Sequence, residues 1–227
     1  MNIIPMKNIK GENMLPKEKI YREKALKVIE NLKKRNMDGI YYESSQQAVG
    51  EIIKMIPQGS LVGLGGSETI IESGLVEELR KLDIHLLDRY KKGIAKEEVN
   101  KMRREALLSD IFITSSNAVT VDGRLVNIDG TGNRVAAMIY GPSKVIFLVG
   151  MNKIVRTLED ALSRIKNHTA PLNAVRVGVE TPCYHLGYCN DPHCHPPNRI
   201  CSQVVIIEAN PTPGRIMVVL VGKELGF

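Results

Sequence analysis

Residues 109–155, SDIFITSSNAVTVDGRLVNIDGTGNRVAAMIYGPSKVIFLVGMNKIV, are the stretch that decides the fold. Apolar runs at 111–113 and 145–149 predict two buried strands, because short continuous apolar runs are typical of parallel sheets. Between them, Asp122-Gly123 predicts a hairpin turn, since both central positions of that turn need a positive φ. Polar residues follow the first strand and precede a predicted helix at 134–140. Open α/β sheets bind their ligands at such strand ends.

The rest of the chain alternates short apolar runs with amphipathic stretches. We expect further strands at residues 40–42, 61–64, 84–87, 204–207 and 216–221. We expect helices that begin at Pro16, at Ser44 or Ser45, at Ser67, at Ala95 and at Thr157. The helix at 67–82 should bury Ile71 and Leu75, and the helix at 95–108 should bury Val99, Met102 and Ala106. This alternation predicts a single-domain α/β fold, a mixed sheet with helices on both faces.

The hairpin and the two terminal strands should add antiparallel pairing to this sheet. We expect one domain over residues 15–227, with a cysteine-rich loop at 181–201. Residues 1–14 differ in character from the rest. We interpret them as a disordered tail or as a mis-annotated start, with Met14 as the true initiator.

Composition excludes several classes of function. The net charge is +6, but residues 1–36 hold ten Lys or Arg and four Glu, so they account for the whole surplus. We therefore expect no nucleic-acid partner, since one charged helix is usually a solvated face. No apolar run approaches membrane-spanning length and no secretory signal is visible, so we expect no membrane partner and a cytoplasmic location.

The loop after the strand at 61–64 is the first candidate for binding. Gly65, Gly66 and Ser67 form a glycine turn that opens a helix, which can expose backbone N–H groups to an anion. The same glycines could simply make a tight turn. Glu68 follows directly and is one of two carboxylates close enough to act as a base.

The polar residues of the opening stretch are the second candidate. The substrate-binding residues expected here are Thr114, Ser115, Ser116, Asn117, Asp129, Gly130, Gly132, Asn133 and Arg134. Arg134 lies in the first turn of a helix, where a cation opposes the helix dipole, so a bound anion would explain it. A salt bridge to Asp129 is the structural alternative. Lys153 should stand at a strand end, either binding an anionic substrate or as a solvated surface lysine.

All four cysteines lie in one short loop, TPCYHLGYCNDPHCHPPNRIC. Cys183, Cys189, Cys194 and Cys201 are spaced C-x5-C-x4-C-x6-C, and such crowding in a cytoplasmic protein favours a metal over disulfides. Zinc sites usually pair cysteines at C-x2–4-C, and only one gap fits. The wider gaps favour a [4Fe-4S] cluster, with Zn²⁺ as the alternative and an absence of metal left open. His185, His193 or His195 could replace one thiolate.

The motifs together resemble the LUD-domain family of lactate-utilisation proteins. The matching pieces are GLGGS at 63–67, SNAVT at 116–120, NIDGTGNRVAA at 127–137, YGP at 140–142 and NKIV at 152–155. The resemblance spans roughly residues 15–227. It implies the fold shared by ribose-5-phosphate isomerase, glucosamine-6-phosphate deaminase and the CoA transferases. Some members carry a similar cysteine quartet before Arg-Ile-Cys, which fits Arg199-Ile200-Cys201.

The family's implied role is the oxidation of L-lactate to pyruvate with iron–sulfur partner subunits. GLGGS lacks the G-x-G-x-x-G spacing of a dinucleotide site, so this chain should contribute binding of a small anionic, lactate-like substrate and electron transfer. The catalytic candidates are Glu68, Asp129 and Lys153. Two alternatives stay open: a non-redox isomerase or CoA-transferase-like enzyme on a phosphorylated or acyl substrate, and a zinc-stapled binding protein. A homo-oligomer is also left open.

Overall fold

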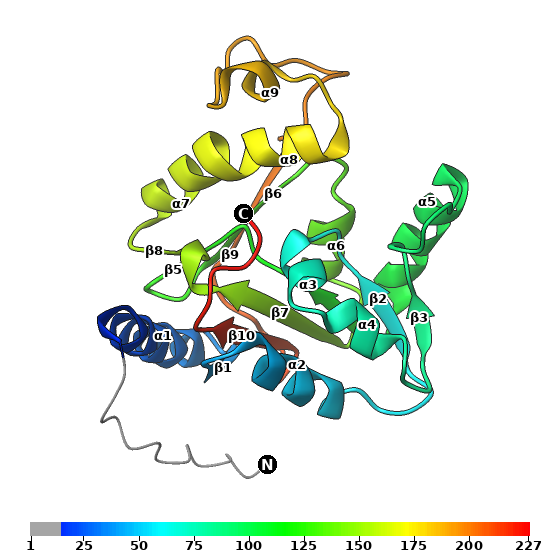
Figure 1. Ribbon diagram of the computed structural model, residues 1–227, viewed down its shortest axis with the longest axis vertical. Helices are drawn as coiled ribbons and strands as arrows, with labels where there is room; N and C mark the ends of the chain where they lie inside the picture. Colours follow the sequence, from blue (N-terminus) through cyan, green and yellow to red (C-terminus); the bar gives the residue numbers. More distant parts are fainter. Residues whose placement is uncertain (1–14) are drawn as a thin grey trace.

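A parallel six-stranded sheet forms the centre of the computed structural model, which describes residues 15–227 (Figure 1). The expectations about residues 1–14 lie outside this range. In sheet order the strands are β1 (Asp38–Tyr42), β10 (Ile216–Val221), β7 (Lys144–Gly150), β4 (Ile111–Thr114), β2 (Leu61–Leu64) and β3 (His85–Leu87). Burial on both faces explains why the central strands read as continuous apolar runs.

Helices cover both faces of this sheet. Along β4 and β7, Phe112 and Phe147 pack on one face, while Ile113 and Ile146 pack on the other, as alternation in a strand requires. The first face packs against α1 (Pro16–Lys34), the 3₁₀ turn η1 (Ala106–Leu108) that follows α5 (Lys96–Glu105), and α6 (Asn133–Ile139). The second face packs against α2 (Ser45–Lys54), α3 (Glu68–Glu72) and α4 (Leu75–Leu79).

A second, four-stranded sheet stands beside the first. Its order is β8 (Ile154–Val155), β5 (Ala118–Thr120), β6 (Leu125–Asp129) and β9 (Gln203–Ile207). Strands β5 and β8 are parallel, and the other two pairs are antiparallel. The predicted α/β class is confirmed, and the strands are divided between these two sheets.

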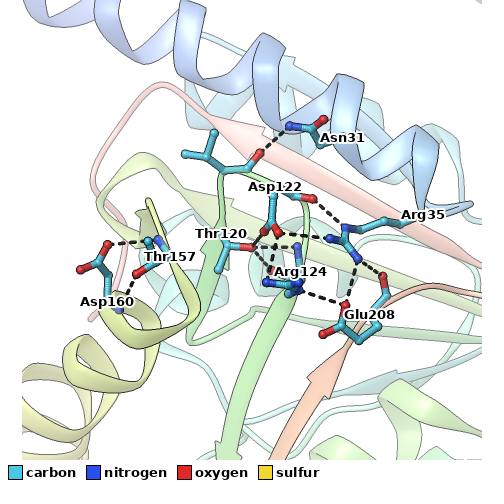
Figure 2. A network of polar contacts seen from close by, with 9 residues as sticks. Asn31, Arg35, Thr120, Asp122, Arg124, Thr157, Asp160 and Glu208 are labelled. Atoms are coloured by element: carbon cyan, nitrogen blue, oxygen red, sulfur yellow. Dashed lines mark hydrogen bonds and ion pairs between the residues drawn. The ribbon is translucent and has the colours of Figure 1, made fainter.

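The hairpin between β5 and β6 is held against α1 by polar contacts (Figure 2). Asn31 Nδ2 donates to the carbonyl of Val121 at 2.9 Å, and Arg35 Nε donates to the carbonyl of Asp122 at 2.6 Å. Gly123 has a φ of +89°, and a Cβ placed there would lie 2.9 Å from the α1 backbone. The Asp-Gly turn therefore serves both the hairpin geometry and its close approach to the helix.

A long helical arm leads from the second sheet to the cysteine loop (Figure 1). It comprises α7 (Leu158–Arg164), the π-helical turn η3 (Ile165–Thr169) and α8 (Ala170–Val177), and α9 (Pro182–Leu186) begins the loop. Thr157 and Asp160 form the expected capping box at its start, at 3.1 and 3.0 Å. Helix α9 was not expected from the sequence.

The two terminal strands do not pair with each other. Strand β9 pairs antiparallel with β6, whereas β10 lies parallel between β1 and β7. The expectation that both add antiparallel pairing is therefore wrong for β10. The apolar residues of β10 are buried on both faces, and this burial is available only in the interior of the parallel sheet.

Two predicted helices also differ in detail. The helix expected at 67–82 is broken at Gly74, which has a φ of +76°, and Ile70 is buried where Ile71 was expected. Helix α5 has no fully buried residue, so Val99 and Met102 are not core positions; Ala106 in η1 is. Within residues 15–227, we find no helix whose length and apolar content would let it cross a membrane.

Candidate functional site

A cationic cavity of about 200 Å³ opens where β2, β4 and β7 end, between the glycine loop, the 129–134 loop and α8. We call it the main cavity. Of the expected residues, those that line it are Gly66, Ser67, Glu68, Ser115, Ser116, Asn117, Asp129, Gly130, Asn133, Arg134 and Lys153. Gly65, Thr114 and Gly132 are not among the residues that line it. Sequence motifs from four separate segments therefore meet around one space.

Lys153 is the most distinctive side chain of the main cavity. It lies in the 3₁₀ turn η2 (Met151–Lys153) after β7 and is only 3% exposed, so the alternative of a surface lysine is wrong. Its Nζ donates to Thr69 Oγ1 at 2.6 Å and contacts Ser115 Oγ at 3.2 Å. Burial, together with the nearby charges of Arg164 and Arg134, lowers the pKa of Lys153 to about 7. A large fraction of these amines is therefore neutral near pH 7, which suits proton transfer.

Asp129 organises the loop that precedes α6. Its carboxylate accepts hydrogen bonds from the backbone N–H groups of Gly130, Arg134 and Val135, at 2.8, 3.1 and 3.3 Å. The Arg134 Nε lies 3.4 Å from the same carboxylate, so the expected salt bridge is present. Three backbone donors and Arg134 therefore occupy this carboxylate, which holds the loop in place. Arg134 remains part of the cavity wall beside it.

Glu68, the other carboxylate candidate, is also engaged. Its Oε1 accepts from Arg176 Nη1 of α8 at 3.0 Å. Lys153 is thus the one catalytic candidate of the three that has no oppositely charged partner within 4.0 Å among residues 15–227.

The glycine loop, residues 65–67, leaves space for neighbouring side chains, and the backbone N–H of Ser67 is not available to a ligand. A Cβ on Gly65 would collide with Thr114, and a Cβ on Gly66 would lie 3.3 Å from the guanidinium carbon of Arg89. The N–H of Ser67 donates to Tyr90 Oη at 2.8 Å, and that hydroxyl donates to the carbonyl of Gly65 at 2.6 Å. Ser67 makes no side-chain cap, and its N–H is already taken.

Asn117 joins the polar run to the hairpin. Its Oδ1 accepts from the N–H of Ile128 at 3.0 Å, and its own N–H donates to Asn127 Oδ1 at 3.1 Å. Ser116 Oγ donates to the carbonyl of Ala118 at 2.8 Å. These two side chains hold the strand ends in place, whereas Ser115 faces Lys153.

Three arginines of the main cavity were not expected from the sequence: Arg89, Arg103 and Arg176. Arg89 follows β3, so the rule that ligands bind at strand ends could have found it. Arg103 on α5 and Arg176 on α8 reach the cavity only through tertiary packing, and their sequence neighbourhoods carry no signal.

The four cysteines line a second, smaller cavity of about 20 Å³. All four are free thiols. Burial, together with Cys183, Cys189 and Cys194, raises the pKa of Cys201 to about 11, so the four thiols lie within electrostatic range of one another. Cys201 and two of its neighbours in space, Ala170 and Ile200, line both cavities.

Arg199 stabilises the cysteine loop through hydrogen bonds and an ion pair. It donates to the carbonyls of Cys194 and Cys201 at 2.7 and 3.0 Å and pairs with Asp191 at 2.8 Å. His185, His193 and His195, all in the described range, are not among the residues that line the cysteine cavity. In residues 15–227, no three His, Cys, Asp or Glu side chains are grouped so that they could hold a metal ion.

Comparison with known proteins identifies the family. The family model of the LUD domain matches residues 25–221, so the chain belongs to the LUD domain family, as its motifs indicate. Its relationship is therefore to lactate-utilisation-type proteins. No curated protein matches the chain.

Two solved structures are similar to the chain. A DUF162 family protein from Deinococcus radiodurans is 13% identical with a TM-score of 0.49, over 88% of this chain and 97% of that one. The eIF2B delta chain from Chaetomium thermophilum is 18% identical with a TM-score of 0.35, over 52% and 50% of the two chains.

Proposed function

We propose that the protein binds a small 2-hydroxy acid such as L-lactate in the main cavity, and that its four cysteines hold a [4Fe-4S] cluster. The observation that carries this proposal is the position of Cys201, which lines both the cationic cavity and the cysteine cavity. An acid in one cavity would lie next to an electron carrier in the other. The role is a contribution to lactate oxidation, with iron–sulfur partner subunits as further electron acceptors.

The type of the donors supports such a cluster, although no three of them are grouped closely enough in residues 15–227 to hold a metal ion. Four thiols from one short loop face a single cavity, and thiolates are the usual ligands of [4Fe-4S] clusters. When bound, the cluster supplies an electron carrier. Arg199, which already fixes the carbonyls of Cys194 and Cys201, would set the loop's shape around it.

The residues of the main cavity supply the rest of the chemistry. Oxidation of a 2-hydroxy acid removes two protons and two electrons. The electrons would leave one at a time through the cluster to the partner subunits, and the proton of the Cα–H bond would pass to solvent. Arg134 would bind the substrate carboxylate, since guanidinium groups match carboxylate geometry. The neutral amine of Lys153 would accept the hydroxyl proton, and Thr69 and Ser115 hold that amine in position.

The non-redox alternative is less well supported by these contacts. An isomerase or CoA-transferase-like reaction would need a carboxylate base in the cavity. Glu68 is paired with Arg176, and Asp129 is occupied by three backbone N–H groups. The redox proposal needs neither carboxylate as a base.

Anaerobic purification followed by iron, sulfide and zinc analysis tests the cluster. We expect about four iron and four sulfide per chain, the content of a cubane cluster. Cys201→Ser should lose most of the iron, whereas Ser202→Ala, an exposed neighbour, should keep it. Zinc without iron would refute the redox role and support a zinc-stapled binding protein.

Calorimetry tests the substrate part of the proposal. L-Lactate should bind the wild-type chain, and Arg134→Gln should weaken that binding by about 1.5–3 kcal/mol, the range for a charged hydrogen bond. An unchanged affinity in Arg134→Gln would remove Arg134 from the site.

A further inference from the structure

The charges of the main cavity are not balanced. Five cationic side chains and two carboxylates line it. Glu68 pairs with Arg176 and Asp129 pairs with Arg134. Of the remaining cations, Lys153 is held by two hydroxyls, which leaves Arg89 and Arg103 without an explanation.

Arg89 is fixed in place but makes no contact that uses its charge. Its guanidinium lies against Gly66, where the missing side chain leaves room for it. The flanking residues anchor its backbone, because Asp88 accepts from the N–H of Tyr90 at 3.0 Å and from Arg80 at 2.8 Å. Within residues 15–227 the Arg89 side chain has no hydrogen bond or ion pair. A guanidinium group that lines a cavity and has no acceptor is available to bind an anion.

Arg103 lines the same cavity as Arg89. After burial, the positive charge of Arg103 is the largest influence that lowers the pKa of Arg89, as expected for two guanidinium groups close together. Arg103 Nη1 donates to Asn100 Oδ1 at 3.0 Å, but its Nε is buried without a partner among the described residues. A buried donor without an acceptor is unfavourable. An oxyanion between the two arginines would satisfy that donor and relieve the repulsion.

Lys153 and the arginine pair are held by different parts of the cavity wall. The Lys153 amine contacts Thr69 and Ser115, whereas the Arg89 guanidinium lies against Gly66 and Arg103 comes from α5. A substrate carboxylate bound by Arg134 would therefore leave the arginine pair available for a second anionic group.

We propose that Arg89 and Arg103 form a subsite for a second oxyanion, so that the acid bound in the main cavity carries two anionic groups. The second group is a phosphate or a carboxylate, and both would be held by the same guanidinium chemistry. The inference deepens the proposed function and rests on it in one respect, since both place an organic acid in this cavity. It narrows the substrate class from simple 2-hydroxy acids to dianionic ones.

Calorimetry with three 2-hydroxy acids tests this inference on the full chain purified anaerobically. L-Lactate carries one charge, L-malate adds a carboxylate and 3-phosphoglycerate adds a phosphate. We expect malate or 3-phosphoglycerate to bind roughly 10- to 100-fold more tightly than lactate, the effect of about one charged hydrogen bond. The acid that gains the advantage identifies the second group.

Variants locate the subsite. Arg89→Gln and Arg103→Gln should each remove most of this advantage, measured as the ratio of the malate or 3-phosphoglycerate affinity to the lactate affinity of the same variant. Arg104→Gln is the matched control, because Arg104 lies on the same helix but is exposed and outside the cavity wall. Arg89→Lys and Arg103→Lys keep the charge, so they should fold and retain part of the advantage.

Several results would overturn the inference. One is that neither malate nor 3-phosphoglycerate binds more tightly than lactate. Another is that the tighter binding persists in both Arg89→Gln and Arg103→Gln. The third is that none of the three acids binds. Iron analysis of the same preparations keeps the two proposals apart. A preparation without iron would refute the cluster and leave the comparison of the three acids valid. Equal affinities for lactate, malate and 3-phosphoglycerate would refute only the second subsite.

Discussion

Replacing Lys153 with methionine tests the buried amine that the proposed chemistry requires. Methionine has a similar length and no charge, so the substitution removes the ionisable group with little change in packing. In the folded protein the pKa of Lys153 is about 7, compared with an ordinary value of 10.5 in an unfolded chain. Between these two pH values, the unfolded chain binds a proton that the folded protein does not.

The sign of the effect follows from proton linkage. Because the unfolded state binds more protons, the free energy of unfolding rises with pH between about 7 and 10.5. The slope is ~1.4 kcal/mol per pH unit, or roughly 5 kcal/mol over the whole window. Below pH 7 the lowered pKa of Lys153 destabilises the wild-type protein by the full amount, and above pH 10.5 it has no effect on stability. Lys153→Met lacks this contribution at every pH.

Urea unfolding of both proteins at pH 7, 8 and 9 provides the measurement. The stability advantage of Lys153→Met should fall by ~1.4 kcal/mol per pH unit as the pH rises. The two lost hydrogen bonds to Thr69 and Ser115 add an offset that does not depend on this titration. Lys92→Met, at an exposed lysine, controls for the loss of one positive charge. A difference that stays constant across this pH range would refute the neutral buried amine.

Three further substitutions probe the scaffold by urea unfolding. Thr157→Ala removes the capping box of α7 and should cost about 1 kcal/mol; no loss would mean that the cap is redundant. Gly123→Ala should cost more than 1 kcal/mol, because its Cβ meets the α1 backbone at a positive φ. Asp129→Ala removes the ion-pair partner of Arg134 and the acceptor of three backbone N–H groups, so it should cost about 3–5 kcal/mol, and a neutral result would contradict its organising role.

The local features of the fold could be predicted from the sequence. Apolar runs located β4 and β7, Asp122-Gly123 located the hairpin, and Thr157 located the start of α7. Each of these signals depends on residues within a few positions of one another. The sheet assignment of β10 could not be predicted this way, because its partners β1 and β7 are distant in sequence.

The position of the main cavity could also be predicted from the sequence, but not all of its side chains could. Polar residues after β2 and β4 pointed to it, since strand ends of a parallel sheet share one edge. The burial of Lys153 depends on Thr69 and Ser115, which come from separate segments, and the sequence around Lys153 does not reveal it. Arg103 was missed for the same reason, as it reaches the cavity from the side of a helix.

The position of β10 has a consequence for how the chain is made on the ribosome. Among the strands of residues 15–227, β1 has β10 as its only neighbour in the sheet, and about 180 residues separate the paired Asp38 and Met217. At synthesis rates of ~5–20 residues per second, β1 waits roughly 10–40 s for its partner. During that time β1 and one edge of β7 have unpaired backbone groups, which are templates for association with other chains. Nascent chains of this protein should therefore depend on chaperones until β10 leaves the exit tunnel.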